Sequence, residues 1–209
     1  MKTSIKSKKK RYELMTIVRG QPILNVRWTK QLRLILKLLK LILVSGYKPD
    51  FIICLATGGL FGAIIARVLG IPYGVWMSQG YEDKKRGVGG RRKKKIYFAD
   101  QIAFIDRRPK AVRKKKPWPW KRVLIIDDLD DSGYTLHKAV RLLRDWYGYK
   151  FDIKTATEWH KTSSFFFVDF VAEVVHQERT TAKWAWIDQP HEQVIRYLQE
   201  QIKPWRQAA

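Results

Sequence analysis

Apolar and polar residues recur along the chain with periods that predict a few well-defined helices and strands. From Trp28 to Val44, lysine and arginine return every three or four positions among leucine and isoleucine, a spacing that collects each kind on one face of a helix. Two short apolar runs, Phe51 to Leu55 and Val123 to Ile126, are typical of strands buried in a parallel sheet. Each leads through small or acidic residues into a helical pattern, at 60–69 and 136–146. Two such units predict an α/β fold with a mainly parallel sheet flanked by helices.

The remaining segments are less regular. Residues 1–11 are rich in lysine and predict a disordered basic tail, and residues 12–209 suit a single domain. Within it, basic residues far outnumber acidic ones between 79 and 122, where glycine and proline interrupt the pattern. This segment predicts an insertion that is flexible in part. Residues 96–104, with Asp100-Gln101 in the middle, predict a hairpin projecting from the sheet.

Composition adds a strong charge imbalance to this picture. The 209 residues contain 42 Lys and Arg against 19 Asp and Glu, a formal net charge of +23. Such a surface attracts polyanions, and two interpretations stay open: a solvated basic surface, or contact with nucleic acid or an anionic membrane, the nucleic acid through the basic tail and the basic loop. No segment is apolar and long enough to span a membrane, and no secretory signal is visible, so we expect a cytoplasmic protein.

Cysteine and histidine carry little predicted chemistry. Cys54 is the only cysteine and lies in an apolar run, which excludes disulfides within the chain and predicts an inert thiol. The four histidines show no metal-binding spacing, so zinc is not expected and each is interpreted as an ordinary core or surface residue.

The segment after the second apolar run concentrates the candidate chemistry. Asp127 and Asp128 stand at the carboxyl end of a predicted strand, where open α/β sheets place their ligands. Residues 132–135 then open a helix, so that backbone N–H groups, hydroxyls and the helix dipole suit a phosphate monoester. An acid pair beside a phosphate site indicates a sugar phosphate. The simpler alternative is an acidic turn in which Ser or Thr only caps the helix.

Two other motifs share these letters. The run Asp-Asp-Leu-Asp-Asp at 127–131 fits the motif of prenyl-diphosphate enzymes, but that motif lies on a long helix, whereas this run follows a strand. Residues 128–132 resemble the first motif of haloacid-dehalogenase-type phosphatases, in which one Asp is a nucleophile. That motif normally opens its domain, and here more than half of the chain precedes it. The phosphatase remains a minor alternative.

The segment 123–135 resembles the signature of type I phosphoribosyltransferases: a hydrophobic strand, two acids, a third acid, and Ser/Thr-Gly-x-Thr. The resemblance implies a type I phosphoribosyltransferase fold with a flexible hood loop and a small C-terminal base-binding lobe. It also implies that Asp127 and Asp128 hold the ribose hydroxyls and Mg²⁺, and that Asp131 lies near the base. The 5′-phosphate of phosphoribosyl diphosphate would then contact Ser132, Gly133, Tyr134 and Thr135.

Over roughly residues 40–195 the chain is similar to the purine branch of this family, the xanthine-guanine enzymes in particular. By this resemblance Thr57, Gly58 and Gly59 form the pyrophosphate loop, although the purine enzymes usually carry Arg or Lys at the position of Thr57. The segment beginning Tyr81-Glu82-Asp83 is similar to the family's hood. Four further residues complete the implied site: Lys161 on a 6-oxo group, Trp186 and Ile187 around the base, and Asp188 at a second magnesium.

The resemblance implies a Mg²⁺-dependent transfer of phosphoribosyl from phosphoribosyl diphosphate to a nucleobase, with release of diphosphate. A 6-oxopurine (hypoxanthine, guanine or xanthine) is the expected acceptor, and a homo-oligomer is expected by family analogy. The alternative, suggested by Thr57 and by the basic composition, is a catalytically weak or inactive member that senses nucleotides or binds RNA.

Overall fold

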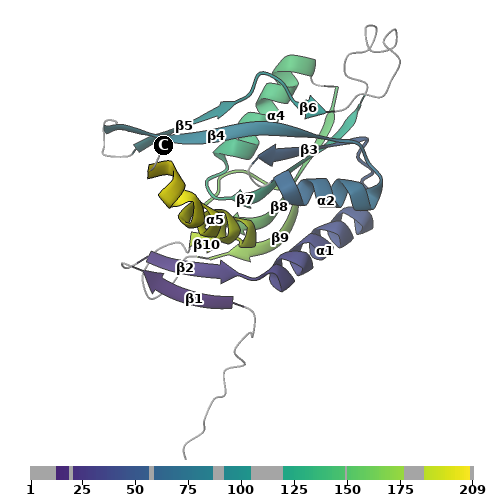
Figure 1. The fold of residues 1–209 in the computed structure, drawn as a ribbon. Helices are drawn as coiled ribbons and strands as arrows, with labels where there is room; N and C mark the ends of the chain where they lie inside the picture. Colours follow the sequence, from purple (N-terminus) through teal and green to yellow (C-terminus); the bar gives the residue numbers. More distant parts are fainter. Residues whose placement is uncertain are drawn as a thin grey trace, which may run out of the picture. The chain divides into compact units, whose positions relative to one another are not determined.

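The computed structural model describes residues 13–18, 21–56, 59–86, 92–104, 120–148, 150–176 and 186–207. The chain divides into two compact units, one made of Met1–Leu34 and His176–Ala209 and the other of Ile35–Val175 (Figure 1). Helix α1, Trp28–Val44, has residues in both. The predicted tail at 1–11 and the parts of the basic insertion at 87–91 and 105–119 lie outside the described residues, as do Thr57 and Gly58.

The larger unit is built on a seven-stranded sheet in the order β5-β4-β3-β7-β8-β9, with β6 also paired to β4. The pairs β3–β4, β3–β7, β7–β8 and β8–β9 are parallel, and β5 and β6 run antiparallel to β4. A mainly parallel sheet is therefore confirmed. Its strands are β3 Phe51–Ala56, β4 Tyr73–Arg86, β5 Arg92–Phe98, β6 Ala103–Phe104, β7 Arg122–Asp130, β8 Asp152–Lys161 and β9 Phe170–Val175.

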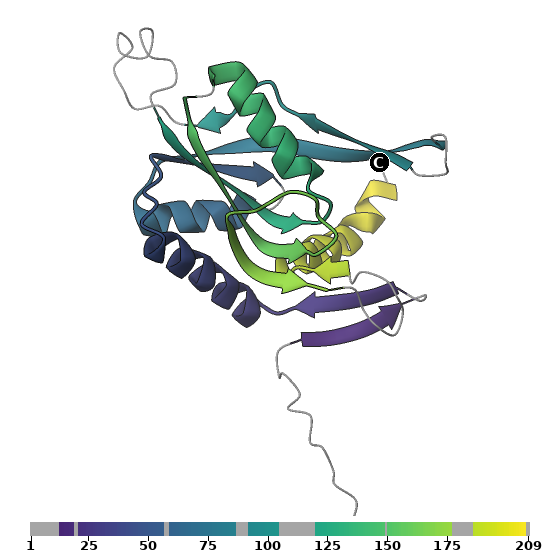
Figure 2. The ribbon, with the colours of Figure 1, turned by 180° about the vertical axis from the view of Figure 1, so that it is seen from behind.

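Helices α2, Gly59–Leu69, and α4, Tyr134–Tyr147, cover opposite faces of this sheet (Figure 2). On one face Ile53 and Ile125 share a buried cluster with residues of α4. On the other face α2 approaches β3 so closely that a Cβ on Gly62 would lie 2.7 Å from the Cys54 sulfur. Because both faces are covered, the two apolar runs are buried along their whole length, which explains why they do not alternate with polar residues.

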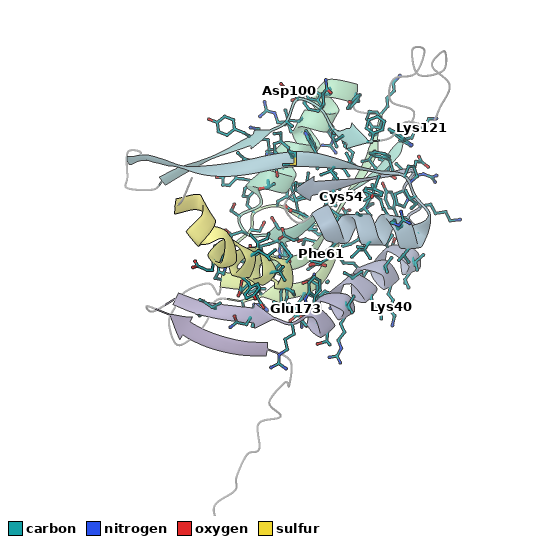
Figure 3. All side chains as sticks on the ribbon, viewed as in Figure 1. Lys40, Cys54, Phe61, Asp100, Lys121 and Glu173 are labelled. Carbon is teal, nitrogen blue, oxygen red and sulfur yellow. The ribbon has the colours of Figure 1, made fainter. Side chains whose placement is uncertain are left out.

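Cys54 and Phe61 both lie inside this unit (Figure 3). Burial raises the pKa of the Cys54 thiol to about 12, so that the thiolate, which is the reactive form, is not populated at neutral pH. The structure thus agrees with an inert thiol.

The predicted hairpin at 96–104 is wrong. Its two halves, in β5 and β6, both pair with β4 and not with each other. The reason is that β4 is fourteen residues long, so its residues from Ser78 onward pair with β5 while Gly74–Val75 pair with β6. The intervening turn is held to the same strand, since the Met77 carbonyl oxygen accepts the Ala99 N–H at 2.9 Å and the Ala99 carbonyl oxygen accepts the Trp76 indole N–H at 2.8 Å. The hairpin is instead formed by β4 and β5.

The smaller unit contains a three-stranded sheet in the order β1-β2-β10. Strands β1, Glu13–Val18, and β2, Gln21–Val26, are antiparallel, and the short strand β10, Trp186–Asp188, runs parallel to β2. Helix α5, Pro190–Gln207, follows directly. The Gln193 side-chain amide ties the helix to both strands by donating to the carbonyl oxygens of Val26 and Asp188 at 3.1 and 2.9 Å.

The described helices include none with the length and apolar character needed to cross a membrane.

Candidate active site

Asp127 and Asp128 lie within strand β7, which continues to a buried Asp130 and so extends past the strand end at Ile126 that the sequence predicted. Asp127 is buried, and burial followed by the negative charge of Asp128 raises its pKa well above the usual value. Backbone N–H groups partly compensate the two carboxylates: that of Asp128 donates to Asp127 Oδ1 at 3.0 Å, and that of Leu129 to Asp128 Oδ1 at 2.8 Å. A cation or hydroxyl donors beside the pair would lower the cost of ionising Asp127.

The donor set of this pair fits magnesium. Carboxylate oxygens are its preferred protein ligands, and Mg²⁺ usually keeps several waters and substrate phosphate oxygens besides one or two carboxylates. In the part of the chain that the structure describes, no group of three or more His, Cys, Asp or Glu side chains is arranged to hold a metal ion. The pair therefore suits a metal whose remaining ligands are water and substrate oxygens.

Asp131 and Lys161, predicted separately, lie together. Lys161 Nζ is 2.6 Å from Asp131 Oδ1, because the parallel pairing of β7 with β8 sets Asp130 opposite His160 and so aligns the residues that follow. The Lys161 side chain is only 9% exposed, whereas that of Asp131 is 47% exposed. The pair thus presents an accessible carboxylate that is held by a largely buried cation.

Beside the Lys161–Asp131 pair lies a second pair, which the sequence did not predict. His160 Nδ1 is 2.8 Å from Asp130 Oδ2, and the Asp130 side chain is almost fully buried. The sequence offered no signal for this contact, since the two residues are thirty positions apart and meet only through the strand register. Two neighbouring acid–base pairs therefore fasten the ends of β7 and β8 to each other.

The predicted phosphate loop leads into helix α4. Gly133 precedes the first helical residue with φ 88°, a left-handed conformation that favours glycine, and no side chain caps the helix there. The simpler alternative, in which Ser or Thr merely caps this helix, is thus not what the described residues show. N–H groups at the start of α4 remain available to an anion, and the positive end of the helix dipole favours one.

The loop at 162–167 adjoins this turn and was also missed. The Ser163 hydroxyl donates to the carbonyl oxygen of Asp131 at 3.3 Å, and the Ser164 N–H donates to that of Lys161 at 2.9 Å. A Cβ on Gly133 would lie 2.7 Å from the Cβ of Phe166. The loop therefore leaves room only for glycine at this point of the turn.

The other predicted residues are placed as follows. Gly59 is the first residue of α2, so the predicted pyrophosphate loop connects β3 to α2. Trp186, Ile187 and Asp188 form β10 in the smaller unit, where Trp186 is exposed and the other two are buried. Their contacts with a base or a metal stay predictions.

A doubly covered, mainly parallel sheet, with an acid pair near the end of one strand and a helix N-terminus after it, is typical of α/β proteins that handle phosphorylated ligands. Residues 27–193 match the family model of the phosphoribosyl transferase domain, and the chain belongs to this family. The predicted type I fold and phosphoribosyltransferase class are thereby confirmed, and the match favours them over the haloacid-dehalogenase alternative.

Solved structures give the same fold. A purine phosphoribosyltransferase from Pyrococcus horikoshii has 26% identity and a TM-score of 0.54, over 78% of this chain and 91% of that one. A xanthine-guanine-hypoxanthine phosphoribosyltransferase from Helicobacter pylori, at 16% identity and a TM-score of 0.58, covers 84% and 97%. A hypothetical protein from Neisseria gonorrhoeae with bound ppGpp has 21% identity and a TM-score of 0.54, over 79% of this chain and 86% of that one. The last two show the fold alone. No curated protein matches the sequence.

Proposed function

We propose that this enzyme transfers phosphoribosyl from phosphoribosyl diphosphate to a 6-oxopurine, with Mg²⁺, and releases diphosphate. The observation that carries the base class is the pair Lys161–Asp131 at 2.6 Å, next to the phosphate loop. A lysine and a carboxylate side by side match two neighbouring groups on one edge of a 6-oxopurine, an oxygen that accepts and an N7–H that donates. The 26% identity to a purine phosphoribosyltransferase also supports this class.

In the proposed complex the 5′-phosphate occupies the turn at 132–135. The N–H groups at the start of α4 and the hydroxyls of Ser132 and Thr135 donate to its oxygens, and Gly133 lets the backbone approach. Asp127 and Asp128 accept hydrogen bonds from the ribose hydroxyls and ligate Mg²⁺, which supplies positive charge toward the diphosphate when bound. The predicted pyrophosphate loop, from Thr57 to Gly59, holds the leaving group by its backbone.

The chemical step exchanges one bond to the ribose for another. The bond between ribose C1 and the diphosphate oxygen breaks, and diphosphate leaves with the electron pair. A base nitrogen, N9, forms the new bond to C1, and Asp131 accepts the proton that N7 gives up. Lys161 donates to the 6-oxo group and stabilises the negative charge that the base develops there. Trp186 and Ile187 are proposed to hold the ring, and Asp188 to ligate a second Mg²⁺.

The test is a single-turnover assay with Mg²⁺, phosphoribosyl diphosphate and hypoxanthine, guanine, xanthine, adenine or uracil. We expect nucleotide from 6-oxopurines only, and none from the Asp131→Asn variant.

Lys161→Gln is the sharper probe of base recognition. Loss of a charged hydrogen bond of about 1.5–3 kcal/mol should raise the KM for the preferred base about 10- to 100-fold and leave that for phosphoribosyl diphosphate nearly unchanged. Lys154→Gln is the matched control, because Lys154 lies on the same strand and also pairs with an aspartate, Asp169, at 2.9 Å. Equal effects of the two substitutions on base KM would contradict the assignment.

A second candidate is a catalytically inactive member that senses nucleotides, and the observation in its favour is Thr57 in place of the usual Arg or Lys. No turnover with any base, together with magnesium-dependent binding of phosphoribosyl diphosphate, would support it. For either function we propose a cytoplasmic location, consistent with one buried cysteine, and a homo-oligomer by family analogy.

A further inference from the structure

A groove of about 590 Å³ lies between strand β5 and helix α4, in the larger unit. Tyr97 of β5 lines one side, and Tyr134, His137 and Arg141 of α4 line the other. Lys138 joins the two elements, since its ammonium group donates a hydrogen bond to the carbonyl oxygen of Ile96. Small-molecule pockets occupy about 300–1,000 Å³, so the groove has room for one nucleotide unit. The proposed catalytic acids do not line it.

The aromatic rings of this groove are exposed. Tyr97 is 53% exposed, Tyr134 is 55% exposed, and Phe165 of the neighbouring loop is 57% exposed. The rings of Tyr134 and Phe165 meet edge to face with centroids 4.8 Å apart, so the aromatic surface continues beyond the groove. Exposed aromatic faces of this kind are the surfaces on which the bases of single-stranded nucleic acids stack.

Basic side chains line the same groove as these tyrosine rings. Lys138 and Arg141 line the groove together with His137, and Asp145 is the carboxylate that faces them. Arg141 Nε is 3.7 Å from Asp145 Oδ2 with both side chains largely exposed, and such a pair contributes little stability. A phosphate can therefore take the place of Asp145 at small cost.

The charge continues along the chain from the groove. Strand β5 begins with four consecutive basic residues, 92–95, directly before Ile96 and Tyr97, and the whole chain carries +23. A single nucleotide would use the groove alone, whereas a polynucleotide would also reach this basic segment. The combination of stacking surface and extended positive charge thus favours a strand over a mononucleotide.

We propose that the groove between β5 and α4, with Phe165 beside it, binds single-stranded nucleic acid. The bases stack on Tyr97, Tyr134 and Phe165, and the phosphates contact Arg141 and Lys138. A duplex is a poor ligand, because stacking inside the double helix covers the faces of its bases. The site shares Tyr134 with the proposed phosphate turn, but none of the proposed catalytic acids lines it, and binding of a strand there does not require turnover.

The test is fluorescence anisotropy of the full chain with a labelled single-stranded oligouridylate of about 16 nucleotides, the upper site size of an OB-fold domain. Tyr97→Ala should weaken binding at least about five-fold, the effect of losing one stacking partner. Arg141→Ala should weaken it and lower the slope of log affinity against log salt by roughly one.

Matched controls separate this groove from general basic attraction. Tyr197→Ala removes an exposed tyrosine on α5, and Arg67→Ala removes an exposed helical arginine on α2; both should bind like the unaltered protein. Circular dichroism confirms that every variant is folded. If Tyr97→Ala and Arg141→Ala bind no more weakly than their controls, or if uridine monophosphate competes at the same concentration of nucleotide as the oligomer, the proposal is overturned.

Discussion

Asp50 is a single residue that fixes where strand β7 begins. Its carboxylate accepts the backbone N–H groups of Lys121 and Arg122 at 3.3 and 3.0 Å, and the Arg122 guanidinium at 2.6 Å. Because Asp50 immediately precedes β3, these bonds set β7 in register beside it, with Phe51 opposite Val123. The acids at the far end of β7 therefore owe part of their position to a contact at its start.

This contact predicts a pH-dependent loss of stability in Asp50→Asn. The Arg122 side chain lowers the pKa of Asp50 against the opposing effect of burial, so the folded protein protonates this carboxylate less readily than the unfolded chain does. The stability that ionised Asp50 contributes is complete above the pKa of this group in the unfolded chain, about 3.9. It disappears as the pH falls through the lower pKa of the group in the folded protein. We expect a loss of about 1 kcal/mol at pH 7 for this partly exposed pair.

Urea unfolding between pH 7 and pH 3 measures this effect. The difference between Asp50→Asn and the unaltered protein should shrink toward zero below pH 4, while Asp100→Asn, at an exposed aspartate, should show no comparable trend. A difference that is constant with pH would mean that Asn destabilises the protein by setting an amide donor against the surrounding N–H donors, and not by the loss of charge.

Single residues also show which parts of the site the sequence could predict and which it could not. Asp127, Asp128 and Asp131 could be predicted because their spacing within one strand-to-helix turn is itself the signal. The contact of Asp130 with His160 could not, because it depends on which residue of β8 faces which residue of β7. A shift of one position in that register would separate the pair.

At the level of elements, the turn into α4 and the loop at 162–167 form one structural unit. Gly133→Ala would place a Cβ 2.7 Å from Phe166 Cβ and 2.8 Å from the Phe166 backbone nitrogen, and rotation of a side chain cannot relieve a backbone contact. We expect a loss of about 1–3 kcal/mol in stability from the left-handed conformation, a further loss from the clash, and a fall in kcat/KM as the phosphate turn shifts.

Gly70→Ala is the matched control for this prediction. Gly70 also has positive φ, 67°, but a Cβ at this residue would meet nothing within 4 Å, so the substitution carries the conformational cost alone. Thermal unfolding and steady-state kinetics compare the two. Equal losses of stability with full activity in both variants would show that the loop at 162–167 moves aside for the added Cβ at no cost.

The elements that could be predicted are those with their own periodic signal. Helix α1 and strand β3 lie where the sequence predicted them, because their apolar residues are placed as burial requires; strand β7 contains the predicted run 123–126 but extends to Asp130. The pairing of strands β4, β5 and β6 could not be predicted, because it is decided by the length of β4 and not by local turn residues.

At the scale of the whole molecule, the net charge of +23 means that repulsion between like charges acts throughout the chain. Like charges in a compact chain repel one another and lower the stability of the folded state. The ion pairs Asp50–Arg122 and Lys154–Asp169 are partly exposed and contribute little each. The repulsion among so many cations should therefore outweigh them.

Salt should consequently stabilise this protein. At about 0.1 M ionic strength the Debye length is about 10 Å, so added salt weakens long-range repulsion more than the short contacts within ion pairs. We expect the Tm to rise between low salt and about 0.3 M sodium chloride, measured by differential scanning calorimetry. Sodium fluoride at equal ionic strength separates screening from chloride binding, because screening predicts equal shifts. A Tm that falls with both salts would show that the ion pairs, and not the net charge, dominate the electrostatics of the fold.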